Sequence, residues 1–209
     1  MKNETQKSDK KATITGIVLA AGRSRRMGRP KQLLPLGPHT VIEVVSRAIR
    51  PHVDQLVILI GHVADQVAAV LSGLDVVIAV NEDVDRGMLS SVQAGMRMAD
   101  TNVHGYFICL GDQPEVSACV IERVLESAHG RAGIIIPTIN GKRGHPIFIH
   151  RRYAEQILRL DSATTGLNSV TRSNEHDTLE IPVEDSLILL DMDTPADYER
   201  VLQHAKENV

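Results

Sequence analysis

The chain has 209 residues, which suits one domain with a sizeable buried core. Its 23 lysines and arginines stand against 26 aspartates and glutamates, so the formal net charge is -3. This balance gives no general attraction to nucleic acid or to an anionic membrane, and we expect neither as a partner. The only cysteines, Cys109 and Cys119, fit neither a zinc spacing nor a disulfide framework, and we expect both to be buried as small hydrophobic side chains.

The first dozen residues are polar and lack the apolar core of a signal peptide. No apolar run approaches the roughly 20 residues that are needed to span a bilayer. We therefore expect residues 1–12 to form a disordered leader, residues 13–209 to form a single domain, and the protein to be cytoplasmic.

Short β-rich runs alternate with segments of helical period along the first two thirds of the chain. The predicted strands are 13–20, 54–61, 74–80, 105–112 and 132–138, and the predicted helices are 40–51, 62–73, 90–99 and 116–128. The strand runs are continuously apolar, as in strands that helices cover on both faces. This pattern predicts an α/β fold, a three-layer Rossmann-like sandwich with a largely parallel sheet.

The rhythm changes after Thr138. Residues 140–149, NGKRGHPIFI, indicate a turn and a short strand, and a helix is expected over about 152–160. Further strands are predicted at 178–183 and 186–193, and a last helix opens at Thr194-Pro195, with proline at its first position. No linker divides the chain, so we expect this half to extend the same sheet.

A long basic loop follows the first predicted strand, at the edge where open α/β sheets bind ligands. Its sequence is LAAGRSRRMGRPK (19–31), and its cations are Arg23, Arg25, Arg26, Arg29 and Lys31. The spacing of its glycines matches neither the dinucleotide fingerprint nor the Walker loop. Glycines permit close backbone approach and the cations neutralise phosphate oxygens, so the loop suits a triphosphate. A solvated basic surface is the alternative.

Two aspartates stand at predicted strand ends. Asp112 follows YFICLG, and Asp193 follows LILLDM, with Asp191 two residues earlier on the same side. A bound triphosphate calls for a divalent cation, and Mg2+ typically takes one or two carboxylates plus phosphate oxygens. Each aspartate could instead be a helix cap or a turn residue. Together with the basic loop, the pair indicates a Mg2+ site.

Two further loops carry polar candidates. In NEDVDRGMLSSVQAG (81–95), Gly87 to Ser91 lead into a helix whose free N–H groups and serine hydroxyls could hold a ribose or phosphate oxygen. Ser90 or Ser91 could instead be a plain N-cap, which is the favoured interpretation. In GKRGHPIF (141–148), His145 fixes a turn more clearly than it serves the chemistry, and a contact at the rim of the substrate site is the second interpretation.

The combination resembles the MobA-like nucleotidyltransferase family, within the nucleoside-triphosphate transferases. The matching segments, in family order, are 19–37, 81–95, LGDQP (110–114), GHP (144–146) and DMDTPADY (191–198). The resemblance implies a nucleotide-diphospho-sugar transferase type of fold and an Mg-dependent enzyme. The catalytic residues it implies are Arg23, Lys31 and Asp112. The metal ligands it implies are Asp112 and Asp193. The nucleotide-binding residues assigned with it are Leu19, Ala20, Ala21, Gly22, Arg26, Asn81, Gly87, Ser90, Ser91 and His145.

Within this family, LAAG and GDQP are most similar to the molybdenum cofactor cytidylyltransferases, whereas guanylyl-transferring relatives usually have a glycine where Ala21 stands. The resemblance thus implies CTP as donor and the terminal phosphate of molybdenum-molybdopterin as acceptor, giving molybdopterin cytosine dinucleotide and pyrophosphate. A recipient molybdenum hydroxylase is a further partner that it implies.

One departure concerns the acceptor. Many of these cytidylyltransferases carry a GDxGAR segment after the late helix, whereas DSATTGLNSVTR (161–172) keeps Gly166 but has Thr164 and Asn168 at the aligned positions. Three alternatives therefore stay open: a guanylyltransferase of the same family, a sugar-phosphate nucleotidylyltransferase, and a non-catalytic protein that delivers cofactor to a molybdenum enzyme.

Overall fold

The computed structural model of the protein describes residues 13–207, so the leader expected at 1–12 lies outside the described residues. Its central sheet has eight strands in the order β10-β7-β9-β6-β1-β4-β5, with β8 paired to β7, and β2 and β3 form a separate two-stranded sheet. The strands are β1 (Thr13–Ala20), β2 (Pro35–Leu36), β3 (His39–Thr40), β4 (Gln55–Ile60), β5 (Val77–Val80), β6 (Val103–Leu110), β7 (Ile134–Ile139), β8 (Lys142–Arg143), β9 (Ile147–His150) and β10 (Thr178–Pro182).

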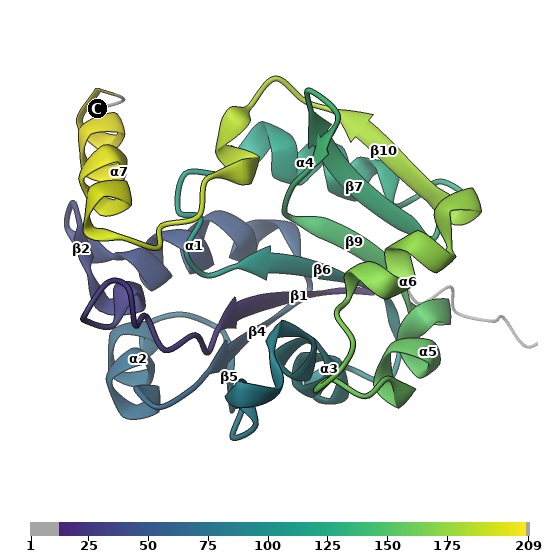
Figure 1. The fold of residues 1–209 in the computed structure, drawn as a ribbon, viewed down its shortest axis with the longest axis horizontal. Coiled ribbons are helices and arrows are strands. Elements are labelled where there is room, and N and C mark those ends of the chain that lie inside the picture. The colour runs from purple at the N-terminus through teal and green to yellow at the C-terminus, as the bar shows by residue number, and fades with distance from the viewer. Residues whose placement is uncertain (1–12, 208–209) are drawn as a thin grey trace, which may run out of the picture.

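Helices cover both faces of this sheet (Figure 1). The α-helices are α1 (Val41–Ile49), α2 (Ala64–Leu71), α3 (Met88–Met98), α4 (Ala118–Ser127), α5 (Ala154–Arg159), α6 (Asn168–Ser173) and α7 (Pro195–Glu207). The 3-10 turns are η1 (Lys31–Leu33), η2 (Arg50–His52), η3 (Val84–Arg86), η4 (Arg151–Tyr153), η5 (Glu175–Asp177) and η6 (Ser186–Leu189).

Two hydrophobic cores explain why the strand runs are apolar throughout. On one face, α1, α2 and α4 pack against side chains such as Val18 and Phe107. On the other face, α3, α5 and α6 pack against side chains such as Ile17 and Ile108. Neighbouring residues of one strand are thus fully buried on opposite faces, which confirms the predicted three-layer sandwich.

The sheet is largely parallel, as predicted. β1 lies between β4 and β6 and runs parallel to both, and β5 and β10 also pair in parallel with their neighbours. The exceptions are β9, which is antiparallel to both β6 and β7, and the short β8, which is antiparallel to β7. Leu19 near the end of β1 is in register with Leu110 at the end of β6. The loops after β1 and β6 therefore leave the sheet at the same edge.

The predicted strand at 186–193 is wrong. Residues Ser186–Leu189 form η6, and residues 190–193 belong to no strand of the sheet. The backbone groups of this segment are used by loops. The Asp185 side chain accepts a hydrogen bond from the N–H of Leu187 (2.9 Å), and the Ile188 carbonyl accepts one from the N–H of His145 (3.2 Å). The Asp185 carboxylate thus takes a backbone N–H that a strand would give to its neighbour, and the N–H of His145 takes a backbone carbonyl.

Several smaller features also differ from expectation. The β2–β3 hairpin and α6 were not predicted, because both elements are short. Cys109 is buried as expected, but Cys119 is exposed, so its expected burial is wrong. Cys119 stands in the first turn of α4, whose buried side chains are Val120, Ile121, Val124 and Leu125.

The last helix, α7, forms a third, smaller core with the loop after β1. Met192, Tyr198 and Val201 pack there with Met27 and residues of the hairpin segment. The Tyr198 hydroxyl donates a hydrogen bond to the Pro35 carbonyl (2.5 Å). No helix among residues 13–207 is long and apolar enough to cross a membrane.

Gly105 in β6 should not accept a side chain. A Cβ there would lie 2.2 Å from Cζ of the fully buried Phe148 and 2.9 Å from the Ile149 carbonyl. We expect Gly105→Ala to lower the free energy of unfolding by about 1 to 3 kcal/mol, the usual cost of overpacking a core. Urea denaturation measures this change. Gly73→Ala, which meets no atom within 4 Å, is the matched control and should change it by less than about 0.5 kcal/mol. Equal stabilities of the two variants would contradict the prediction.

Candidate functional site

A cleft lies at the carboxyl ends of β1 and β6 and brings together most of the residues assigned from sequence. The assigned residues that line it are Leu19, Ala20, Ala21, Gly22, Arg23, Lys31, Gly87, Ser91 and Asp112. The other lining residues are Gln32, Val84, Met88, Leu110, Gly111 and Asp191, and of these only Asp191 was weighed from sequence as a site residue. The cleft therefore lies where open α/β sheets hold their ligands.

The basic loop owes its shape to a buried amide that sequence reasoning missed. The Gln32 side chain is 1% exposed, and its Nε2 donates to the carbonyls of Ala20 (2.7 Å) and Gly22 (3.1 Å). The Ser24 hydroxyl accepts a hydrogen bond from the N–H of Lys31 (3.1 Å). These hydrogen bonds hold residues 22–31 against the end of β1 and fix the conformation of the loop.

Two glycines let neighbouring strands approach the end of β1 closely. A Cβ at Gly61, after β4, would lie 2.6 Å from the Ala21 carbonyl oxygen, and one at Gly111, after β6, would lie 2.9 Å from the Ala20 Cβ. Real Cβ atoms do not approach other atoms this closely, so both positions require glycine. Gly111 belongs to the motif LGDQP, so the sequence marked it as part of the site. Nothing in the sequence around Gly61 indicates that glycine is required there.

The cations of the loop face carboxylates from distant parts of the chain. Lys31 Nζ forms an ion pair with Asp112 and lies 2.9 Å from Oδ1 of Asp193. Arg26 also pairs with Asp193 (2.6 Å), and Arg23 pairs with Asp85 of η3. The side chains of Lys31 and Asp112 are 12% and 16% exposed, whereas those of Arg23 and Arg26 are 45% and 70% exposed. The lysine pair is thus the sheltered centre of the cluster.

The ionisation of these groups follows from burial and mutual charge. Burial raises the pKa of Asp112, and the neighbouring Lys31 only partly offsets this effect. Burial tends to lower the pKa of Lys31, but Asp112 and Asp193 together raise it above its ordinary value. Burial tends to raise the pKa of Asp193, but Lys31 and Arg26 bring it below the usual range. Lys31 is therefore positively charged at neutral pH.

Asp112 and Asp193 fit a divalent cation by their arrangement. Both carboxylates are within hydrogen-bond distance of one nitrogen atom, Lys31 Nζ, so both can face a single cation. One or two carboxylates completed by phosphate oxygens and water is the set that Mg2+ usually takes. Among residues 13–207, no three His, Cys, Asp or Glu side chains are grouped so that they alone could hold a metal. Substrate oxygens would have to complete such a site.

Asp191 lines the cleft, although it does not lie on the strand that the sequence predicted. The segment is not a strand, but Asp191 and Asp193 both lie near enough to Asp112 for their charges to raise its pKa. Gln113 Nε2 donates to Asp191 Oδ1 (2.9 Å), and the N–H of Met192 donates to the Asp112 carbonyl (3.1 Å). These bonds join the segment before α7 to the turn after β6. Asp112 lies in that turn, two residues beyond the strand's end.

Asn81 and Ser90 do not line this cleft. Asn81 Nδ2 donates to the hydroxyls of Ser90 and Ser91 (2.9 Å each), and Ser90 donates in turn to the Gly87 carbonyl (2.8 Å). α3 begins at Met88 with Gly87 as its cap, so the N-cap predicted at a serine is wrong. Gly87 takes this position because its φ is +88°. The serines instead hold the loop 81–87 against the helix.

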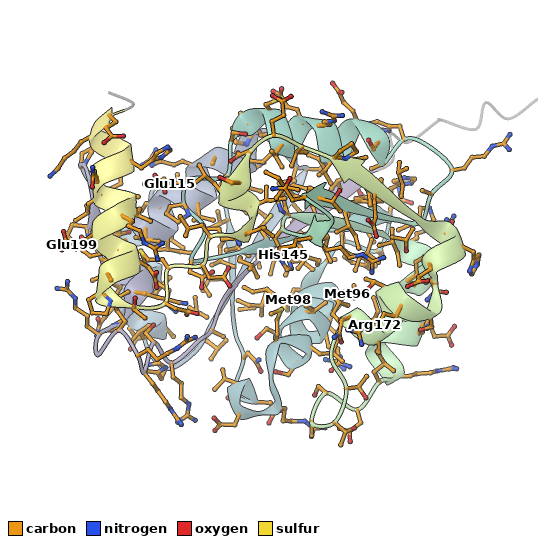
Figure 2. The ribbon with its side chains drawn as sticks, turned by 45° about the horizontal axis from the view of Figure 1, so that its top comes forward. Met96, Met98, Glu115, His145, Arg172 and Glu199 are labelled. Atoms are coloured by element: carbon orange, nitrogen blue, oxygen red, sulfur yellow. The ribbon has the colours of Figure 1, made fainter. Side chains whose placement is uncertain are left out.

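His145 lines a separate cavity beyond Met88 rather than the cleft. Burial lowers the pKa of its imidazole to about 4, although Asp112 opposes the shift, so the ring is neutral at physiological pH. Its backbone N–H bonds to the Ile188 carbonyl, and its peptide bond to Pro146 is cis. Figure 2 shows His145 near the centre of the molecule, far from Glu199 on α7.

Comparison with known proteins adds a family. Residues 16–179 match the model of the MobA-like NTP transferase domain. The molybdenum cofactor cytidylyltransferase of Escherichia coli K12 is 26% identical over 188 residues, which cover 90% of this chain and 94% of that protein. The nicotine blue oxidoreductase of Paenarthrobacter nicotinovorans is 35% identical over 145 residues, which cover 65% of this chain and 70% of that protein. Probable molybdenum cofactor guanylyltransferases also match.

Solved structures show the same likeness. The crystal structure of Rv0371c from Mycobacterium tuberculosis H37Rv matches with a TM-score of 0.83 and 33% identity, covering 92% of this chain and 98% of that chain. The complex of that protein with manganese matches with a TM-score of 0.79 and 30% identity, covering 92% and 99%. The likeness thus extends over nearly the whole of both chains.

The neutral state of His145 has a consequence for stability. Because its folded pKa is about 4 rather than 6.5, the unfolded chain binds a proton first as the pH falls, and stability is lost between about pH 6.5 and 4. In His145→Gln this loss should be smaller by about 1 to 3 kcal/mol, with partial solvent contact reducing the full effect. Urea denaturation at pH 7, 5.5 and 4.5 measures it. The control is His129→Gln at an exposed position. Parallel curves for wild type and His145→Gln would contradict the prediction.

Proposed function

The chain belongs to the MobA-like NTP transferase family, and from this premise we propose that it transfers CMP from CTP to the terminal phosphate of molybdenum-molybdopterin. The products are molybdopterin cytosine dinucleotide and pyrophosphate. The observation that carries the proposal is the convergence of Lys31, Asp112 and Asp193 beneath the basic loop. This arrangement supplies both signs of charge that a triphosphate and a divalent cation require.

CTP is the nucleotide that the sequence of the β1 end favours. Ala21, 5% exposed, lines the cleft at the position where guanylyl-transferring members of the family usually have a glycine. The E. coli cytidylyltransferase is similar over nearly the whole chain, which supports the same choice. The probable guanylyltransferases among the relatives keep GTP as the second candidate.

The proposed reaction is an in-line displacement at the α-phosphorus. An oxygen of the acceptor phosphate forms the new P–O bond, the bond from the α-phosphorus to the bridging oxygen breaks, and pyrophosphate leaves with the electron pair. The acceptor phosphate is already an anion at neutral pH, so no general base is needed. The protein's role is to align the two phosphates and to neutralise the charge that moves to the leaving group.

The cations of the loop are placed for this role. Arg23 and Arg26 lie in exposed ion pairs, which contribute little stability, so exchanging a carboxylate for a phosphate oxygen costs little. Lys31 is sheltered and stays charged, so its attraction to a phosphate is less weakened by water. With nucleotide present, Mg2+ held by Asp112 and Asp193 would neutralise phosphate oxygens. The manganese complex of the mycobacterial relative supports a divalent cation in this fold.

A pyrophosphate assay tests the proposal. The purified protein is given each of the four nucleoside triphosphates with Mg2+ and either molybdenum-molybdopterin or glucose 1-phosphate as acceptor. We expect release with CTP and molybdenum-molybdopterin, and little with the other combinations. If GTP were the single nucleotide that gave release, GTP would replace CTP as the proposed donor. If glucose 1-phosphate were the single acceptor that gave release, a sugar phosphate would replace molybdenum-molybdopterin as the proposed acceptor. No release in any combination would contradict the transferase proposal. It would favour the alternative in which the protein delivers the cofactor, in the cytoplasm, to a molybdenum hydroxylase.

The charged centre should be essential to turnover but not to folding. We expect Asp112→Ala and Lys31→Ala each to lower kcat/KM for CTP by about 10² to 10³, the usual cost of losing one preorganised electrostatic contact. Arg123→Ala, an exposed cation on α4, is the control and should stay within about twofold of wild type. Circular dichroism should show native folding in all three. Normal turnover by Asp112→Ala in Mg2+ would remove this residue from the site.

A further inference from the structure

Asn81 is a buried residue that contacts the start of α3 without lining the nucleotide cleft. It directly follows β5, which lies beside α3 (Figure 1). The residue is 6% exposed, and the cleft lining does not include it. Its Oδ1 accepts a hydrogen bond from the N–H of Asp83 (2.9 Å), and its Nδ2 donates to the hydroxyls of Ser90 and Ser91 (2.9 Å each). Any effect of Asn81 on a ligand in the cleft must therefore pass through a neighbouring group.

The N–H of Asp83 decides which end of the Asn81 amide faces the serines. A backbone N–H can only donate, so the amide oxygen must be the atom that meets it. The amide nitrogen then faces the two hydroxyls, and this nitrogen can only donate. Each serine oxygen therefore accepts a hydrogen bond from Asn81, and each hydroxyl proton must point elsewhere.

The two hydroxyl protons have different surroundings. Ser90 can donate its proton to the carbonyls of Gly87 (2.8 Å) and Asp83 (3.0 Å), so its hydrogen bonds are complete. Within residues 13–207, the Ser91 hydroxyl has no acceptor for its proton. Ser91 is 5% exposed and lines the nucleotide cleft, whereas Ser90 does not line it. A sheltered donor without an acceptor is unfavourable, so a ligand in the cleft that offers an acceptor would gain this hydrogen bond.

We propose that Asn81 is a positioning residue for the nucleotide. By donating to the oxygen of Ser91, it keeps the Ser91 proton available to an acceptor atom of the nucleotide. This inference rests on the proposed function, because it takes the cleft to hold a nucleoside triphosphate. The shared chemistry is a lone pair on oxygen or nitrogen, which the base, the ribose and the phosphates all carry. An acceptor in place of the Asn81 nitrogen would take the Ser91 proton for itself.

Asn81→Asp makes that reversal with little change of shape. At pH 8 the introduced carboxylate is ionised and can only accept, so it keeps the bond from the N–H of Asp83 and captures the Ser91 proton. We expect the Kd for CTP with Mg2+, measured by titration calorimetry without an acceptor substrate, to rise about 5- to 100-fold. Asn102→Asp adds the same charge in the exposed turn before β6 and should stay within about twofold of wild type. Equal Kd values for Asn81→Asp and wild type would overturn the inference.

Asn81→Ala separates this role from a purely structural one. Alanine removes the donor without supplying an acceptor, so the Ser91 proton stays available to the nucleotide. We expect Asn81→Ala to raise the Kd for CTP less than Asn81→Asp does. A role limited to holding the loop 81–87 gives the reverse order, because the aspartate keeps the hydrogen bond from Asp83 and alanine does not. That reverse order would overturn the inference.

A double-mutant cycle with Ser91→Ala separates the captured proton from the added charge. Ser91→Ala removes the proton itself and should raise the Kd for CTP by a similar factor. If Asn81 acts through Ser91, adding Asn81→Asp to Ser91→Ala changes the Kd by less than about twofold. If the new negative charge simply repels the triphosphate, the full loss appears again in the Ser91→Ala background, and the inference is overturned.

The binding measurement also separates this inference from the proposed function. Wild type that binds CTP but releases no pyrophosphate contradicts the transferase proposal, and the cycle still decides the role of Asn81. Wild type that binds GTP instead changes the proposed donor, and the same cycle is then measured with GTP. Wild type that binds neither nucleotide overturns both. Inorganic triphosphate with Mg2+ locates the acceptor: a loss by Asn81→Asp with this probe as well as with CTP supports a phosphate oxygen, and a loss with CTP alone supports the nucleoside.

Discussion

The ammonium group of Lys31 between the carboxylates of Asp112 and Asp193 is the interaction on which the rest of the site depends. Two carboxylates this close repel one another, and burial already raises the pKa of Asp112. Lys31 offsets the repulsion, so both acidic side chains can face the same point. A divalent cation bound with the nucleotide would also offset the repulsion between the two carboxylates. The same three side chains can therefore be stable without a ligand and still accept one.

The fold was largely predictable because its main signal is local. Continuous apolar runs separated by helical period define the sandwich, and the structure confirms its layers and the mostly parallel sheet. The error at 186–193 arose because composition resembles a strand while the backbone partners come from elsewhere in the chain. His145, which bonds to the Ile188 carbonyl, lies more than forty positions earlier, and a single sequence gives no sign of such a contact.

The charged residues of the site could be predicted from the sequence, but the residues that hold the basic loop in place could not. Arg23, Lys31 and Asp112 are recognisable because uncompensated cations and strand-end carboxylates are unusual in sequence. Gln32 is a polar residue like many surface residues, and only its burial reveals that it fixes the loop through two carbonyls. Ser90 and Asn81 suggested ligand binding, yet their groups satisfy one another. Which polar groups are left over for a ligand depends on distances that sequence does not contain.

The bond between Lys31 and Asp193 joins residues that are 162 positions apart. α7 also packs against the segment after β1, where the Tyr198 hydroxyl donates to the Pro35 carbonyl, so this part of the loop's support comes from the end of the chain. On a ribosome, the sheet strands β1, β4 and β6 can pair long before residue 193 emerges. The chain thus completes its charged centre last, and a product truncated before residue 193 would lack the second carboxylate even if its sheet had formed.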